Sequence, residues 1–293
     1  MPLPQPAPAA PPAFVLAREA ALATPVVFAS PHSGRWYPDD LVAASALDPL
    51  TLRASEDALV DRLAEGVTAH GAALLTCAAA RAYVDVNRDP RELDPALVAA
   101  GIDLGPAMAS PRVQAGLGVV PRMVGDGRII HCRPLTRAEI EGRLEAVHRP
   151  YHAALASLLE EARARFGAAI LIDLHSMPSA AGALEARRGR GRPQMVLGDR
   201  HGAACGRALN LAVRTQLEKA GYRVALNSPY AGGFVTQTWG RPAEDLHALQ
   251  IEIDRGLYLN EATLEPVTGY DRLKADLERL AAMLCTDWRR LVA

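Results

Sequence analysis

Short apolar runs alternate with longer amphipathic segments from residue 25 onward. Apolar runs that end in polar or glycine-containing turns predict buried strands, here over residues 25–30, 72–78, 82–87, 168–175, 194–199, 222–227 and 247–253. Apolar residues at helical spacing predict helices over residues 49–70, 136–166, 202–220 and 270–291. Strands that alternate with helices in this way are typical of an α/β fold.

Local signals mark several boundaries in this pattern. Thr136 and Glu139 have the spacing of a capping box, and Pro150 is expected to kink or divide the helix that they begin, because proline removes a helical hydrogen bond. Residues 1–13 are rich in proline and alanine, and we expect them to form a disordered tail. Residues 14–293 show no composition break and no internal repeat, so we expect a single domain there.

Composition and charge narrow the classes of function. The chain has 32 basic and 33 acidic residues, so no net field favours nucleic acid or an anionic membrane, and a small-molecule partner is expected. No run approaches the roughly 20 apolar residues that a membrane span needs. The first residues lack the basic start and apolar centre of a signal peptide, which predicts a cytoplasmic enzyme. Nothing in the sequence indicates the oligomeric state.

Cysteine spacing and one arginine-rich loop add little chemistry. The four cysteines, at positions 77, 132, 205 and 285, are scattered, so we expect buried small side chains rather than disulfides or a thiolate zinc cluster. The loop between His175 and Gln194 is rich in glycine, proline and arginine. Its basic run predicts a solvated face, and residues 179–193 are a candidate lid.

Two histidines follow predicted strands and are the first candidates for a metal site. His32 comes after the strand over 25–30, and His175 ends the strand over 168–175. Ligand sites collect at the carboxyl ends of strands in open α/β sheets. A catalytic zinc ion needs a third ligand and one open position, and the acids at 56 and 57 are candidates. We prefer Asp57 to Glu56, although spacing leaves both possible.

Two further acids lie on predicted strands. Asp173 is two residues before His175 and therefore on the same face of its strand, where it can orient the imidazole or play an ordinary buried role. Glu252 lies between two isoleucines, and an unpaired carboxylate there would be costly to bury. It is either a general base beside the metal or a structural carboxylate paired with an arginine or facing solvent.

Polar residues after other strands indicate an anionic substrate. Asn87 ends the run over 82–87, and Arg88 and Arg91 follow it. Forked guanidinium groups suit planar carboxylates, although solvated arginines are an equal alternative. Gly232 and Gly233 allow the backbone to approach a ligand closely, or they form a plain tight turn.

Eight short segments occur in a fixed order, each too short to be specific alone. They are PHSG, DxxVDRL, RAYVDVNRD, PLT followed by RPYH, DLHS, LGDRHG, NSPYxGGF and QIEIDRGLY. Together they resemble the N-formylglutamate amidohydrolase family over residues 25–258. The resemblance implies a three-layer α/β/α fold with a mixed sheet, of the phosphorylase/hydrolase-like type found in zinc carboxypeptidases. It also implies hydrolysis of N-formyl-L-glutamate, an N-acyl acidic amino acid, to glutamate and formate in histidine degradation.

The resemblance also implies roles for individual residues. His32, Asp57 and His175 would hold Zn²⁺, and Glu252 would be the general base. Asn87 and Arg88 resemble a carboxylate-binding Asn-Arg pair. Further candidates for substrate binding are Arg81, Arg91 and the loop that contains Asn227, Tyr230, Gly232 and Gly233.

The chain departs from the family pattern at Ala58, where an aromatic residue is expected, and in the arginine-rich insertion after Met177. These departures leave the acyl group and the amino acid open. A deacylase of another N-acyl amino acid or small amide, and a non-catalytic relative that binds an acidic ligand, therefore remain alternatives.

Overall fold

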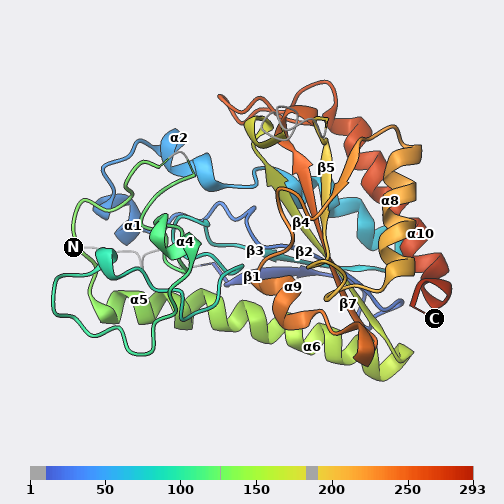
Figure 1. The fold of residues 1–293 in the computed structure, drawn as a ribbon, viewed down its shortest axis with the longest axis horizontal. Coiled ribbons are helices and arrows are strands. Elements are labelled where there is room, and N and C mark those ends of the chain that lie inside the picture. Colours follow the sequence, from blue (N-terminus) through green and yellow to red (C-terminus); the bar gives the residue numbers. More distant parts are fainter. Residues whose placement is uncertain (1–10, 126, 183–190, 293) are drawn as a thin grey trace, which may run out of the picture.

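A mixed seven-stranded sheet forms the centre of the protein (Figure 1). The computed structural model describes residues 11–125, 127–182 and 191–292. The strands run in the order β1-β3-β2-β4-β7-β5-β6. They are β1 (Phe14–Ala17), β2 (Val26–Ser30), β3 (Ala73–Cys77), β4 (Ala169–Met177), β5 (Met195–Gly198), β6 (Val224–Leu226) and β7 (Leu246–Asp254).

The middle of this sheet is parallel, and an antiparallel pairing borders it on each side, after which β6 joins β5 in parallel. Strands β3, β2, β4 and β7 pair in parallel, whereas β1 joins β3 and β5 joins β7 in antiparallel fashion. β4 and β7 are buried over all nine of their residues, as expected for parallel strands that are covered on both faces.

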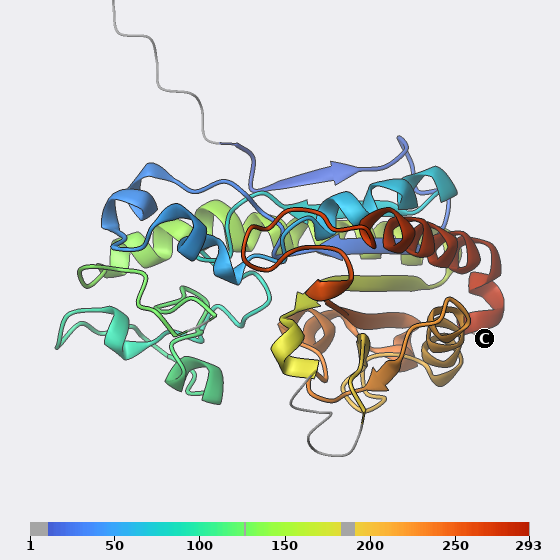
Figure 2. The same ribbon diagram turned by 90° about the horizontal axis from the view of Figure 1, so that it is seen from above.

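Helices cover both faces of the sheet, which gives the expected three layers (Figures 1 and 2). α6 (Arg149–Phe166) and α9 (Phe234–Trp239) lie on one face. α3 (Val60–Ala64), α8 (Arg207–Lys219) and α10 (Tyr270–Val292) lie on the other. Successive strand side chains point to opposite faces, so Leu171 packs with the α6 layer and Ile172 with the α10 layer. The predicted α/β class with a mixed sheet is confirmed.

The remaining helices gather at one end of the sheet (Figures 1 and 2). They are α1 (Asp39–Ala44), α2 (Pro49–Leu52), α4 (Pro111–Gln114) and α5 (Arg137–Arg143). Short 3-10 turns cover Arg53–Ser55, Glu65–His70, Pro95–Leu97, Pro242–Glu244 and Arg255–Leu257. The capping box predicted for Thr136 and Glu139 is present at α5. A π-helical turn over Leu144–His148 joins α5 to α6 without a break in the helical backbone, and Pro150 follows it in the first turn of α6, so the expected kink or division takes the form of a π-turn just before the proline.

Two predicted elements are wrong. Residues 49–70 do not form one helix, because Glu56 is extended and Leu59 adopts a left-handed φ of 65° between α2 and α3. Residues 82–87 do not form a strand. Asp85 and Val86 are both buried, so the apolar alternation there reflects a segment enclosed on all sides, and the Asp85 N–H donates to the Val119 carbonyl rather than to a ladder partner.

Several smaller expectations also need correction. The sequence pattern missed strand β1, a short apolar run over Phe14–Ala17 directly after the stretch rich in proline and alanine. Cys77 and Cys205 are buried as expected, but Cys132 is exposed. Among the described residues no helix is both long and apolar enough to cross a bilayer. Most of the expected tail, residues 1–10, and the centre of the candidate lid, residues 183–190, lie outside the described residues, so both expectations stay predictions.

Candidate metal centre and substrate pocket

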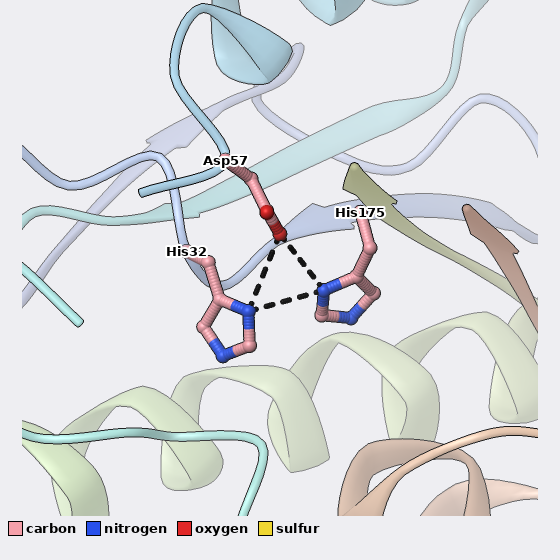
Figure 3. Close-up of side chains that lie close together, drawn as sticks. All are labelled: His32, Asp57 and His175. Atoms are coloured by element: carbon pink, nitrogen blue, oxygen red, sulfur yellow. Dashed lines mark hydrogen bonds and ion pairs between the residues drawn. The ribbon is translucent and has the colours of Figure 1, made fainter. Parts of the chain in front are cut away.

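His32, Asp57 and His175 meet at the carboxyl ends of β2 and β4 (Figure 3). β2 and β4 are parallel neighbours, which brings the histidine after one strand beside the histidine near the end of the other. The His175 Nδ1 atom lies 3.1 Å from His32 Nδ1 and 3.1 Å from Asp57 Oδ2. The His32 Nδ1 atom lies 3.3 Å from Asp57 Oδ2, and all three side chains are buried. Three ligand atoms therefore converge on one point.

The other ring nitrogen of each histidine contacts a buried carboxylate. His32 Nε2 lies 2.8 Å from Asp85 Oδ1, and His175 Nε2 lies 3.0 Å from Asp173 Oδ2. Carboxylates behind imidazoles fix the tautomer and the ring orientation of metal-binding histidines. Each imidazole thus donates through Nε2 and presents Nδ1 to the centre.

The two oxygens of the Asp57 carboxylate also have different partners, as the two ring nitrogens of each histidine do. Its Oδ2 atom faces the two imidazoles, while Oδ1 accepts hydrogen bonds from Ser176 Oγ at 2.9 Å and from Arg255 Nη2 at 3.2 Å. One oxygen is therefore free for a cation and the other is occupied. Glu56, the alternative ligand, accepts hydrogen bonds from Tyr37 and Arg53 and points away from the centre.

The charges of this cluster favour a cation. Burial would raise the pKa of Asp57, but hydrogen bonds and charge from His175 and His32 outweigh burial and hold it well below its usual value. Burial would lower the pKa of His175, yet Asp173 and Asp57 raise it well above the usual value. The carboxylates therefore stabilise positive charge at this point, whether protons or a metal ion carry it.

A short irregular segment contacts both histidines. It contains Asp85, which contacts His32, and Asn87, whose Nδ2 lies 3.1 Å from His175 Nε2. Two histidines of the helical layer hold this segment through its carbonyl groups. His152 Nε2 donates a hydrogen bond of 2.7 Å to Val86 O. The neighbouring His148 donates one of 2.9 Å through Nε2 to Arg88 O.

Glu252 lies on β7 beside this cluster. It pairs in register with His175 on the neighbouring strand β4, and only 7% of its surface is exposed. Gln250 Nε2 donates a hydrogen bond of 2.8 Å to Glu252 Oε1. Burial raises the pKa of Glu252, and the charge of Asp57 adds to this effect. A buried carboxylate with a raised pKa next to three converging ligand atoms is suited to general base chemistry.

The cluster and Glu252 line a pocket of about 640 Å³. Five arginines also line it, at positions 81, 88, 112, 200 and 255, together with the predicted residues Asn87, Tyr230, Gly232 and Gly233. Asn87 is largely engaged elsewhere, because Oδ1 accepts a hydrogen bond of 2.8 Å from the Val235 N–H while Nδ2 contacts His175.

Two predicted substrate residues lie outside this pocket. Arg91 is exposed and pairs with Asp89 at 2.7 Å. Asn227 instead shapes a turn, since its side chain donates to Asp199 Oδ1 at 2.8 Å and its backbone has a left-handed φ of 55°. Ala58, the departure from the family pattern, is buried in the apolar core on the α10 side of the sheet and does not line the pocket.

Several residues of the site were not singled out from the sequence. Gln250 is two residues before Glu252 on a strand, so period-two spacing places both on one face and could have revealed it. Asp85, Arg112, Arg200 and Arg255 follow no such rule, since their positions depend on turns whose path the sequence pattern does not define.

Comparison with known proteins identifies the family to which this chain belongs. A sequence model of the family described as N-formylglutamate amidohydrolase matches residues 24–259. The chain belongs to the N-formylglutamate amidohydrolase family. The match includes all three residues of the cluster and Glu252, and it confirms the resemblance seen in the sequence.

Relatives of this family show similarity over most of the chain. An N-formylglutamate deformylase from Pseudomonas putida is 29% identical over 249 residues, which is 83% of this chain and 84% of the relative. One from Pseudomonas aeruginosa is 29% identical over 241 residues, 81% of this chain and 83% of the relative. The crystal structure of an N-formylglutamate amidohydrolase from Ralstonia eutropha JMP134 superposes with a TM-score of 0.88 at 39% identity, covering 94% of this chain and 98% of that one.

The close packing of Gly233 against Asn87 gives a testable prediction. A Cβ atom at Gly233 would lie 2.4 Å from Asn87 Nδ2, and Asn87 has little room to yield because its Oδ1 accepts a hydrogen bond from the Val235 N–H and its Nδ2 lies against the buried His175 ring. We expect Gly233→Ala to lower the free energy of unfolding by about 1–3 kcal/mol, measured by urea denaturation. Gly142→Ala is the matched control. A Cβ there meets nothing within 4 Å, so the helical alanine should stabilise by about 0.5–1 kcal/mol. Equal stability of Gly233→Ala and the parent protein would contradict the packing argument.

Proposed function

We propose that this protein hydrolyses N-formyl-L-glutamate to L-glutamate and formate with the help of a bound zinc ion, acting in the cytoplasm. The observation that carries the proposal is the convergence of His32, Asp57 and His175 on one point beside the buried carboxylate of Glu252. Membership of the N-formylglutamate amidohydrolase family and the names of the relatives support the choice of substrate.

The donor set suits zinc. Two imidazole nitrogens and one carboxylate oxygen are a usual set for catalytic zinc, which keeps a further position open for water or substrate. His32 and His175 each present one nitrogen, because the other contacts Asp85 or Asp173. Asp57 presents one oxygen, so the protein supplies three donor atoms and leaves room for a fourth ligand.

Glu252 would move the proton in this reaction. A bound zinc ion would polarise the scissile carbonyl and increase the acidity of the attacking water. Gln250 holds Glu252 Oε1, so Oε2 is the atom that accepts the proton from water. The protonated carboxyl then donates it to the departing nitrogen, and one side chain serves first as base and then as acid.

The walls of the pocket suit an anionic substrate. Arg81 and Arg88 lie beside the metal centre and offer guanidinium donors for the α-carboxylate. Tyr230, Gly232 and Gly233 line the same pocket, and the Gly233 N–H donates a hydrogen bond of 2.9 Å to Gln250 Oε1. These guanidinium groups favour an N-acyl amino acid, which carries a carboxylate, over a neutral amide.

Substrate identity is tested with a panel of N-acyl amino acids. We expect formate release from N-formyl-L-glutamate to exceed acetate release from N-acetyl-L-glutamate in kcat/KM by at least about 10-fold, measured with the zinc-loaded protein. A larger kcat/KM for the acetyl compound would identify a deacylase of another specificity. A protein that turns over no member of the panel would favour a non-catalytic acid-binding relative.

The role of Glu252 is tested by Glu252→Gln. The amide keeps the shape of the side chain but cannot accept the proton, so we expect kcat to fall by about 100- to 10,000-fold while zinc stays bound in a 1:1 ratio. Glu218→Gln on the surface of α8 is the matched control, and it should retain normal turnover. Near-normal kcat in the Glu252 variant with zinc fully bound would show that another group is the base.

A further inference from the structure

The arginines of the pocket differ in how far their charge is neutralised by the protein itself. Arg81 Nε lies 2.9 Å from Asp85 Oδ2, and Arg255 Nη2 lies 3.2 Å from Asp57 Oδ1. Both partners are buried carboxylates next to the metal centre. These two guanidinium groups therefore balance charges that the fold has already buried.

The guanidinium groups of Arg88 and Arg200 are less closely paired with carboxylates. Arg88 is buried and donates hydrogen bonds to the carbonyl oxygens of Leu117 at 3.1 Å and Asn87 at 3.0 Å. Arg200 is only partly exposed and lines the same pocket, yet its guanidinium group makes no hydrogen bond or ion pair with any residue of the described ranges. Its positive charge is available to a ligand.

The backbone holds Arg200 in an unfavourable conformation. Its φ is 54°, in the left-handed region that residues other than glycine seldom adopt. The Arg200 N–H donates to Ala231 O at 2.7 Å, and its Cγ packs so closely on Gly232 that a Cβ there would lie 3.1 Å away. Strained backbone of this kind persists where surrounding contacts enforce it, often at binding sites. The loop with the paired glycines thus fixes the stem of Arg200.

The sheet places Arg200 on the opposite side of the metal centre from Arg81. Arg81 follows β3 and Arg200 follows β5, and the three strands between β3 and β5 bear or precede His32, His175 and Glu252. Because β5 runs antiparallel to β7, Gly198 at its end lies level with Gln250, and the turn after it brings Arg200 to the pocket wall. With adjacent strands about 4.8 Å apart, β3 and β5 lie about 19 Å apart. Arg81 and Arg200 line the same pocket of about 640 Å³ from opposite sides of this strand set, so a small dicarboxylate can lie between them.

We propose that Arg200 binds the side-chain carboxylate of the substrate and thereby selects an acidic amino acid. This inference rests on the proposed hydrolysis of an N-acyl amino acid, in which Arg81 and Arg88 take the α-carboxylate. A free guanidinium fork that faces a pocket suits bidentate binding of a second, planar carboxylate.

Arg112 is the other pocket arginine without a carboxylate partner among the described residues, and its charge acts on Arg88 and on Tyr230. Burial lowers the pKa of Arg88, and the nearby charges of Arg81 and Arg112 lower it further. Arg112 is also exposed on the four-residue helix α4. Arg112 therefore adds positive charge to the pocket from an exposed side chain, whereas the loop that contains Ala231 and Gly232 fixes the stem of Arg200, and for this reason the side-chain carboxylate is assigned to Arg200.

The test compares N-formyl-L-glutamate with N-formyl-L-glutamine, which has nearly the same shape but no side-chain charge. A hydrogen-bonded ion pair contributes about 1.5–3 kcal/mol, so we expect Arg200→Gln to lower kcat/KM for the glutamate compound by about 10- to 100-fold, mainly through KM. Its kcat/KM for the glutamine compound should change less than about threefold, and Arg200→Lys should recover part of the preference. Arg112→Gln should lower kcat/KM for both substrates by the same factor.

Arg207→Gln on α8, exposed and outside this pocket, is the control for removal of a positive charge. It should leave the ratio of the two substrates unchanged. A ratio that stays unchanged in Arg200→Gln, or an equal loss for both substrates, would overturn the assignment of Arg200. So would a loss of preference in Arg112→Gln instead.

Equilibrium binding separates this inference from the proposed reaction. Calorimetric titration with L-glutamate and L-glutamine measures selection without turnover. We expect the parent protein to bind L-glutamate more tightly and Arg200→Gln to bind both alike. If the parent protein hydrolyses no N-formyl-L-glutamate, the proposed reaction is wrong, but the binding preference and its loss in Arg200→Gln still decide the role of Arg200.

Discussion

The structure depends on the burial of carboxylates in the middle of an apolar sheet. Asp57, Asp85, Asp173 and Glu252 are all buried within one small region at the ends of β2, β4 and β7. An isolated buried charge is very costly, so each carboxylate needs a compensating partner. Imidazole and guanidinium groups supply part of that compensation, and the point where the free ligand atoms converge is where a divalent cation would supply the rest.

This constraint explains why the segments around the centre are irregular. In a regular helix over residues 49–70, the direction of the Asp57 side chain would be set by the helical period. The extended Glu56 and the left-handed Leu59 break this period, and the Asp57 carboxylate faces the two histidines instead. The segment from Asp85 to Arg88 likewise does not pair with a strand of the sheet. His148 and His152 of the helical layer donate hydrogen bonds to its carbonyl groups instead. The irregular segments carry the chemistry, while the parallel strands supply a rigid frame.

The sequence was informative wherever one local rule decided the outcome. The central strands were predictable because continuous apolar runs are typical of parallel strands, and His32 and His175 were found because they follow such runs. The segment over 82–87 was misread because burial on all sides produces the same apolar alternation as a strand. The position of Arg200 was beyond local rules, since it depends on a left-handed turn and on packing against a distant loop.

The most direct test of the account is the metal content of the purified protein, followed by formate release from N-formyl-L-glutamate with and without a chelator. The account predicts close to one zinc ion per chain, loss of turnover when a chelator removes it, and recovery when zinc is restored. Full turnover by metal-free protein would contradict the central claim that His32, Asp57 and His175 form a catalytic metal site.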